Sequence, residues 1–323
     1  RAGPVPGLSP TPARHLARGA ARALFNVQPG GDFHTSVFPP FVCLLARVAQ
    51  RRRPGPALPW LQSNRCARSA AVRSQRDTAM DLTKNFVKAK RPCTEGFRWF
   101  LRHYEDGGNY QELLDALVAD GRINDACWLL DQFGPTDAVR TLDTLFAEAM
   151  VFAGTLEVRG NIEADGLVRA GRDIRAGGGI HVGDRLIAGG DLRCGGGIWC
   201  GDALVTGGDL RAAWGIESQG EIACGGELRA GWAVHCSGEL TVVGNALIGE
   251  DLDAAEDVHC GKSLQAGGAI RTHSLRAGHG VLAGSSIHCA QHLEAGWGMR
   301  ADGDIVAGGA IRAGEGLEAQ GEI

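Results

Sequence analysis

A large apolar side chain recurs at every sixth position from 156 to 323. Only Ala246 of the 29 positions in this series lacks a larger apolar side chain, and a single step of five interrupts the series after Ile270. The series is Leu156, Ile162, Val168, Ile174, Ile180, Leu186, Leu192, Ile198, Leu204, Leu210, Ile216, Ile222, Leu228, Val234, Leu240, Ala246, Leu252, Val258, Leu264, Ile270, Leu275, Val281, Ile287, Leu293, Met299, Ile305, Ile311, Leu317 and Ile323. So strict a period indicates a repeat architecture in which each unit stacks on the next.

A column of small side chains lies two positions after each of these apolar positions. Of its 28 members, 15 are Ala and six are Cys. Because residues i and i+2 of a strand point to the same face, each hexad directs one large and one small side chain inward. Gly follows in 17 of the 28 hexads, where a corner requires a positive φ or a close backbone approach. The unit is therefore a short strand plus a corner, which predicts a β-helix.

A longer period of three hexads sets the size of one coil. Four successive segments of three hexads each, from 171 to 242, begin with Gly and carry an acidic, an aliphatic and an Arg residue at their third to fifth positions. Three hexads therefore make one triangular coil, and 29 hexads make nine to ten coils. At ~4.8 Å per coil this is roughly 45 Å. We predict a mainly β fold in which residues 141–323 form a parallel β-helix.

Two different segments precede the repeat. Residues 80–140 show helical spacing of apolar residues, with three short helices expected between 94 and 133, and this predicts a small α-helical cap domain at one end of the β-helix. Residues 1–79 carry 12 Arg, no Lys, two Asp, no Glu and ten of the 12 Pro. We interpret this Arg/Pro-rich segment as disordered or non-native, with Met80 as the real start. An organellar transit peptide is the alternative interpretation.

The three-hexad period also aligns outward side chains into ladders. Four arginines form one ladder, and an acidic residue precedes each of them by two positions. This predicts a ladder of self-neutralising ion pairs in preference to a polyanion site. The pairs are Asp173 with Arg175, Asp191 with Arg193, Asp209 with Arg211, and Glu227 with Arg229.

Two further outward columns are candidate interaction surfaces. Ile187, Val205, Ala223 and Thr241 form a column of small, mostly apolar side chains, which suggests a lateral contact. Trp199 lies on a different face, in a column with His181, Glu217, His235 and Asp253. Trp214 and Trp232 are three hexads apart, so we expect them to stack at a corner near Trp199. These tryptophans could bind a protein or a glycan, or they could simply cover a corner.

The small inward column contains Cys194, Cys200, Cys224, Cys236, Cys260 and Cys289, and no two of these occupy the same position in consecutive coils. We interpret them as buried, reduced thiols, which favours a reducing compartment. We predict no metal, cofactor or catalytic residue. Residues 80–323 carry 21 basic and 35 acidic residues, a net charge of -14, which argues against non-specific nucleic-acid binding. No apolar run approaches the roughly 20 residues of a transmembrane helix.

The repeat resembles the bactofilins, a family of bacterial polymer-forming cytoskeletal proteins. The residues that carry the resemblance are runs such as Gly189-Gly190-Asp191-Leu192-Arg193 and Gly308-Gly309-Ala310-Ile311-Arg312-Ala313-Gly314. The same hexad is similar to the β-helix of flagellar assembly protein A. The resemblance covers about 154–323. It implies a right-handed triangular β-helix in the bacterial cytoplasm, free or associated with a membrane.

We predict a non-enzymatic, cytoskeleton-like scaffold protein that self-associates through its β-helix. The predicted contact is the coil at Ile323, together with Ile311 and Leu317, because an open coil presents unpaired backbone groups to a second copy. A monomeric spacer or a rod that binds a protein or glycan through its tryptophans is the alternative. A hexapeptide-type acyltransferase is a third interpretation, for which His273 at the shortened step is the catalytic candidate, but an uninterrupted repeat offers no concave site.

Overall fold

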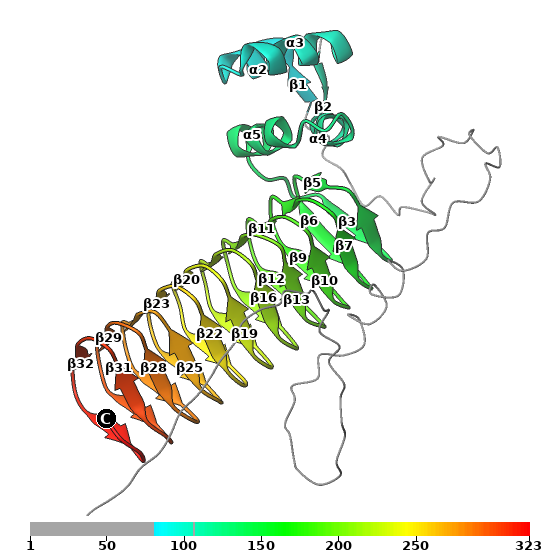
Figure 1. Ribbon diagram of the computed structural model, residues 1–323. Helices are drawn as coiled ribbons and strands as arrows, with labels where there is room; N and C mark the ends of the chain where they lie inside the picture. Colours follow the sequence, from blue (N-terminus) through cyan, green and yellow to red (C-terminus); the bar gives the residue numbers. More distant parts are fainter. Residues whose placement is uncertain (1–80, 106) are drawn as a thin grey trace, which may run out of the picture. The chain divides into compact units, whose positions relative to one another are not determined.

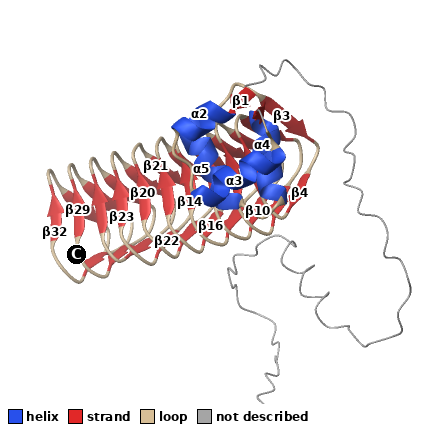
Figure 2. Ribbon diagram, turned by 90° about the horizontal axis from the view of Figure 1, so that it is seen from above, coloured by secondary structure: helices blue, strands red, loops and turns tan. Residues whose placement is uncertain are grey.

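A computed structural model describes residues 81–105 and 107–323 of the protein. The predictions for residues 1–79 and for Met80 lie outside these described residues. Within them, three parallel sheets run along a solenoid, and a small helical region precedes it (Figure 1). The predicted parallel β-helix with a preceding helical segment is therefore confirmed. Figure 2 shows that all the helices belong to this preceding region and that the later coils consist of strands and loops.

The helical region contains four helices and a two-stranded antiparallel sheet. Its elements are β1 (Asp81–Thr83), α2 (Lys84–Ala89), α3 (Thr94–His103), β2 (Gly107–Asn109), α4 (Tyr110–Ala119) and α5 (Ile123–Phe133). Asn109 caps α4 as expected, because its side-chain oxygen accepts hydrogen bonds from the backbone N–H groups of Gln111 and Glu112. Helix α2 and the short sheet were not predicted, because they have no extended apolar period.

The strands of the solenoid form one sheet of 11 strands and two sheets of ten, each named here after its first strand. The β3 sheet contains β3 (Val139–Leu142), β6 (Thr155–Val158), β9 (Ile174–Ala176), β12 (Leu192–Cys194), β15 (Leu210–Ala212), β18 (Leu228–Ala230), β21 (Ala246–Ile248), β24 (Leu264–Ala266), β27 (Val281–Ala283), β30 (Met299–Ala301) and β33 (Leu317–Ala319). The β4 sheet contains β4 (Leu145–Ala147), β7 (Ile162–Ala164), β10 (Ile180–Val182), β13 (Ile198–Cys200), β16 (Ile216–Ser218), β19 (Val234–Cys236), β22 (Leu252–Ala254), β25 (Ile270–Thr272), β28 (Ile287–Cys289) and β31 (Ile305–Ala307). The β5 sheet contains β5 (Met150–Phe152), β8 (Val168–Ala170), β11 (Leu186–Ala188), β14 (Leu204–Thr206), β17 (Ile222–Cys224), β20 (Leu240–Val242), β23 (Val258–Cys260), β26 (Leu275–Ala277), β29 (Leu293–Ala295) and β32 (Ile311–Ala313).

The register confirms three hexads per coil. Leu192 pairs with Ile174 on one side and with Leu210 on the other, so neighbouring strands of a sheet are three hexads apart in the chain. The shortened step removes one residue from one coil, and Val258 therefore pairs with Leu275. The inward aliphatic and small side chains of successive coils form one continuous buried cluster from Leu145 to Ile305. The buried side chains of each short strand thus pack against those of the neighbouring coils, and this packing holds the solenoid together.

The solenoid begins one coil before the regular series. In the first coil Arg140 pairs in register with Leu156, at a position that is apolar in the later coils. Its guanidinium lies 4.9 Å from the ring centroid of Phe152 and forms an ion pair of 3.0 Å with Asp115 of α4. This coil departs from the hexad pattern, because its spacing is irregular and one inward position is charged.

Close backbone approach, not positive φ, explains the corner glycines. Among the described residues, glycines with positive φ are Gly107, Gly121 and Gly134, all outside the solenoid. A Cβ on Gly189 would overlap the carbonyl oxygen of Gly171 in the preceding coil. A Cβ on the following glycine of the same corner, Gly190, would overlap a carboxylate oxygen of the preceding coil. Corners therefore stack so closely that a side chain is excluded at these positions.

The helical region packs on the outer face of the β5 sheet. The outward side chain of Val151 and the corner residues Ala153 and Leu167 are buried in the same apolar cluster as the cores of α4 and α5. Gln111 of α4 donates to the carbonyl oxygen of Val151 at 3.1 Å and accepts from the backbone N–H of Ala153 at 2.9 Å. The expected cap thus contacts a side face of the first coils as well as the inward Arg140.

Candidate interaction surface

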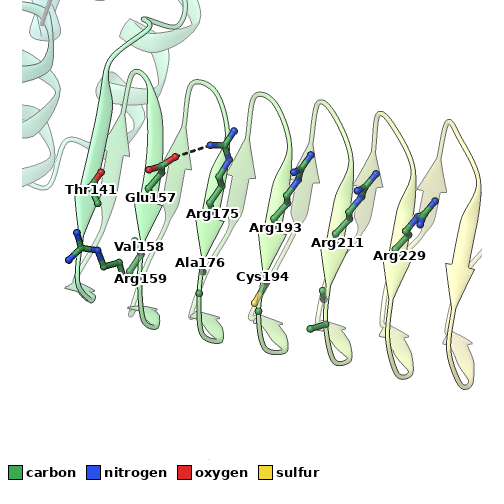
Figure 3. Close-up of a pocket in the computed structure, with 14 residues that line it drawn as sticks. Thr141, Glu157, Val158, Arg159, Arg175, Ala176, Arg193, Cys194, Arg211 and Arg229 are labelled. Carbon is green, nitrogen blue, oxygen red and sulfur yellow. Dashed lines mark hydrogen bonds and ion pairs between the residues drawn. The ribbon is translucent and has the colours of Figure 1, made fainter. Parts of the chain in front are cut away.

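The four predicted arginines form a ladder along the outer face of the β3 sheet. Successive members pair in register, from Arg175 on β9 to Arg229 on β18. They line an open groove of about 780 Å³, in which Figure 3 shows the four guanidinium groups arranged in parallel. Such a row of cations could bind a polyanion only if the charges were free.

The charges of this ladder are paired, as the sequence analysis expected. The ion-pair distances are 2.9 Å for Arg175 with Asp173, 3.0 Å for Arg193 with Asp191, 2.8 Å for Arg211 with Asp209, and 2.9 Å for Arg229 with Glu227. Glu157 adds a second partner for Arg175 at 2.8 Å. The ladder is therefore close to neutral, which disfavours a polyanion site.

The acidic residues also support the backbone of the next coil. In Asp191, Oδ2 binds Arg193, while Oδ1 accepts from the backbone N–H of Asp209 at 2.9 Å. Asp209 repeats this arrangement toward the N–H of Glu227 at 2.9 Å. That backbone hydrogen bond, assisted by Arg211, lowers the pKa of Asp209 against the opposing effect of burial. The residue pattern predicts the ion pairs but not this second role, which explains an acidic residue directly before the inward aliphatic.

The tryptophans lie in stacked pairs on and beside the β4 sheet. Trp214 and Trp232 stack at the corner before β16 and β19, with ring centroids 5.4 Å apart and an interplanar angle of 7°. Trp199 on β13 stacks on His181 of β10 at 4.1 Å. Trp214 and Trp232 remain 40% and 37% exposed, whereas Trp199 is half-buried. The predicted stacking at the corner is confirmed, and both candidate side chains there remain partly exposed.

The apolar column on the β5 sheet is also in the predicted register, but the helical region covers part of it. Ile187 pairs with Val205, Val205 with Ala223, and Ala223 with Thr241. Ile187 packs against the apolar cluster of the helical region. Val205, Ala223 and Thr241 follow it on the next three coils and belong to neither apolar cluster. The column therefore contacts the helical region at Ile187, whereas its members on the next three coils lie outside the apolar cluster of that region.

The six solenoid cysteines are free and buried, as predicted. All but Cys289 donate the S–H to a backbone carbonyl of the previous coil, for example Cys194 to Gly178 at 3.0 Å. Ser218 makes the equivalent bond to Asp202 at 2.6 Å. Burial raises the pKa of Cys194 to about 11. Cys and Ser in the small inward column therefore donate to corner carbonyls of the previous coil, which Ala cannot do. The sequence pattern, in which Cys simply replaces Ala, does not predict these hydrogen bonds.

His273, the single catalytic candidate, lies at the shortened corner. It lines an open groove of about 470 Å³ together with His235, Asp253 and Arg271. Asp253 binds Arg271 at 3.0 Å and lies 3.4 Å from Nδ1 of His235. Over residues 81–105 and 107–323, no group of three or more His, Cys, Asp or Glu side chains is arranged to hold a metal ion. No helix in the same residues is long and apolar enough to span a membrane.

The last described coil contains the three remaining candidates. Ile311 on β32 is half-buried, and Leu317 on β33 is 38% exposed although it continues the inward series. Ile323 is 66% exposed. Leu317 and Ile323 are exposed because no described strand lies beyond them in the three sheets.

Two family models match the chain. A model described as the YdhT N-terminal domain matches residues 80–133, which include the described helical region. A model described as the Flagellar Assembly Protein A beta solenoid domain matches residues 121–300. No curated protein and no solved structure is significantly similar to the chain. Because the second model covers more than half of the 323 residues, the chain belongs to the FapA β-solenoid family.

Proposed function

We propose that this protein is a structural element of a larger assembly and has no catalytic role. The observation that carries the proposal is the continuous solenoid, in which almost every strand is hydrogen-bonded to a strand on each side and one apolar cluster extends from Leu145 to Ile305. Each coil is hydrogen-bonded to its neighbours along three sheets at once. Bending between two coils would strain the hydrogen bonds of at least one sheet, so the solenoid resists bending. Membership of the FapA solenoid family supports the same assembly role.

The surfaces of the solenoid also fit a structural role. They present ladders of one residue type, such as the paired arginines of the β3 sheet, and these ladders repeat along the axis. A partner can contact a ladder over several coils, whereas catalysis needs different groups directed at one point in a concave site. The six reduced, buried thiols support a reducing compartment, and we propose a cytoplasmic location in a bacterium.

The finer form of the proposal is self-association by stacking of coils. Its support is the exposed apolar side chains of Leu317 and Ile323 at inward positions, beside the edges of β31, β32 and β33 that pair with no described strand. A second copy could continue the three sheets over this coil and bury both side chains. The polymer-forming, cytoskeletal part of the prediction came from the resemblance to bactofilins and stays a prediction.

Sedimentation velocity of the full chain over a range of concentrations tests self-association. The test variant carries Ile311→Lys and Leu317→Lys, which place two charges at inward positions of the last coils. The control carries Val306→Lys and Gln320→Lys, which add the same charge at exposed positions nearby. We expect the wild type and the control to associate and the test variant to stay monomeric. A monomeric wild type at high concentration would contradict self-association and leave a monomeric rod.

A binding rod is the second candidate function. Trp199, Trp214, Trp232 and Trp297 are the aromatic residues of segment 154–323 other than histidine. The partial exposure of Trp214 and Trp232 supports a contact with a protein or a glycan, because tryptophan is enriched at the centres of interfaces.

A further inference from the structure

The outer face of the β5 sheet already binds helices within the chain. Figure 1 shows α4 and α5 beside β5, and the apolar cluster of the helical region includes Val151, Leu167 and Ile187 of the first three coils. Arg169 of β8, between them, forms an ion pair with Asp131 of α5. This face of the sheet is therefore suited to pack against helices, and the register of its strands is unchanged in the coils that follow.

The same column continues beyond the helical region as a flat strip of small side chains. We call Val205, Ala223 and Thr241 the strip; they lie on β14, β17 and β20, paired in register. At ~4.8 Å per coil the strip spans about 10 Å, which is close to two turns of an α-helix. The next member of the column is His259, after which the column becomes charged. The strip is thus bounded by the helical region at one end and by charges at the other.

Acidic side chains border the strip along the corner that precedes these strands. Asp202, Glu221 and Glu239 lie one or two residues before β14, β17 and β20, and all three are exposed. Among the described residues, Asp202 and Glu221 form no ion pair, and Glu239 lies 3.4 Å from His259. This border differs from the arginine ladder of the β3 sheet, where each acidic residue has an arginine partner. The strip is therefore a half-buried, mostly apolar surface, and two of the three carboxylates on its border form no ion pair with the described residues.

We propose that the strip binds an amphipathic helix of a partner protein whose apolar face is bordered by Lys or Arg. Continuity with the surface that holds α4 and α5 supports a helix as the occupant, and the acidic border supports a basic one. The proposal rests on the assembly role proposed above and names the class of partner.

A second copy of the chain fits the strip poorly. Two strips that faced each other in antiparallel copies related by a two-fold axis would place their acidic borders side by side, where like charges repel. In parallel copies, the helical regions would stand on the same face at the same level and keep the two strips apart. The helices α4 and α5 carry Glu112, Asp115, Asp125 and Asp131 but no Lys or Arg, so they do not complement the border either.

Fluorescence anisotropy with the full chain tests the proposal. The probe is a labelled 15-residue peptide of Leu, Ala and Lys, with Leu at i, i+3, i+4 and i+7 and Lys at the borders of that face. A second peptide replaces every Lys by Glu. The test variant of the protein carries Ala223→Lys and Thr241→Lys, and the control carries Leu247→Lys and Gln265→Lys, which add the same charge on the outer face of the β3 sheet.

We expect the basic peptide to bind the wild type and the control equally, and to bind the test variant about tenfold more weakly. The acidic peptide should bind at least about tenfold more weakly than the basic one. Equal binding of both peptides, or equal binding to the test variant and the control, would overturn the proposal. Sedimentation of the test variant without peptide separates the alternatives. A loss of self-association there would identify a second copy as the occupant and reject a basic partner helix. Failure of the proposed coil stacking would instead appear as a monomeric wild type, or as equal association of the wild type and the last-coil variant, whatever the peptide result.

Discussion

The corner carboxylate Asp209 is expected to stabilise the solenoid through a backbone hydrogen bond more than through its ion pair. Its Oδ1 accepts from the N–H of Glu227 at 2.9 Å, and its Oδ2 accepts from Arg211 at 2.8 Å. Asp209→Asn keeps an oxygen for the N–H and removes the charge, whereas Asp209→Ala removes both. The two substitutions therefore separate the two contributions.

The expected magnitudes differ clearly. Loss of a hydrogen bond from a half-buried amide to a charged acceptor costs about 2 kcal/mol. The exposed ion pair contributes less than about 1 kcal/mol. Thermal unfolding followed by circular dichroism should then show a Tm lowered by about 4–8 °C for Asp209→Ala and by a few degrees at most for Asp209→Asn, since about 1 kcal/mol corresponds to about 2–4 °C in a chain of this size. Equal losses for the two variants would refute the backbone role.

The pH dependence gives a second test of the same carboxylate. The N–H of Glu227, together with Arg211, holds the pKa of Asp209 below its ordinary value in the folded state. The resulting stabilisation is therefore present above the unfolded-state pKa of about 4 and is lost as the pH falls through the lower folded-state pKa. The Tm difference between the wild type and Asp209→Asn should shrink below about pH 4. A difference that stayed constant from pH 7 to pH 3 would contradict this assignment.

Two further predictions concern the interior. Ile198→Asp places a charge in the apolar cluster at a side chain that is 3% exposed, and it should destabilise the solenoid by about 5 kcal/mol. Ile198→Val should cost about 1 kcal/mol. If urea unfolding gave the two variants similar free energies of unfolding, the inward position of Ile198 would be disproved. Cys194 and Cys289, whose pKa values burial raises to about 11 and about 12, should resist alkylation at pH 8 in the folded protein while the exposed Cys93 reacts. Peptide mass spectrometry would show early labelling of Cys194 if that thiol were accessible.

The repeat arithmetic determined most of the architecture. In a strand the side chains alternate between faces, so the positions of large and small residues indicate which side is buried without any tertiary information. The three-hexad period then gives the neighbours between coils, and the structure pairs Leu192 with Ile174 and Leu210 as that period requires. The arginine–carboxylate ladder and the Trp214–Trp232 stack follow from the same period.

Where the period breaks or several explanations share one pattern, the sequence was insufficient. The first coil has irregular spacing, and the hexad pattern does not predict that Arg140 takes an inward register position there and pairs with Asp115 of α4. The corner glycines fit both a positive φ and a close approach, and the backbone geometry shows close approach. The interaction between the corner carboxylates and the next coil depends on which oxygen faces the amide, and a residue pattern does not specify that.

The sequence by itself determined which side chains point outward, because that depends on local alternation and a constant period. Only the tertiary structure decided which of those outward side chains are covered. Ile187 and Val205 occupy equivalent positions in consecutive coils, yet Ile187 packs against the helical region and Val205 does not. The difference arises because the docking of α4 and α5 depends on contacts between residues far apart in the chain, such as Gln111 with Val151 and Ala153. The repeat presents equivalent side chains on every coil, whereas the described helices pack against the first coils only.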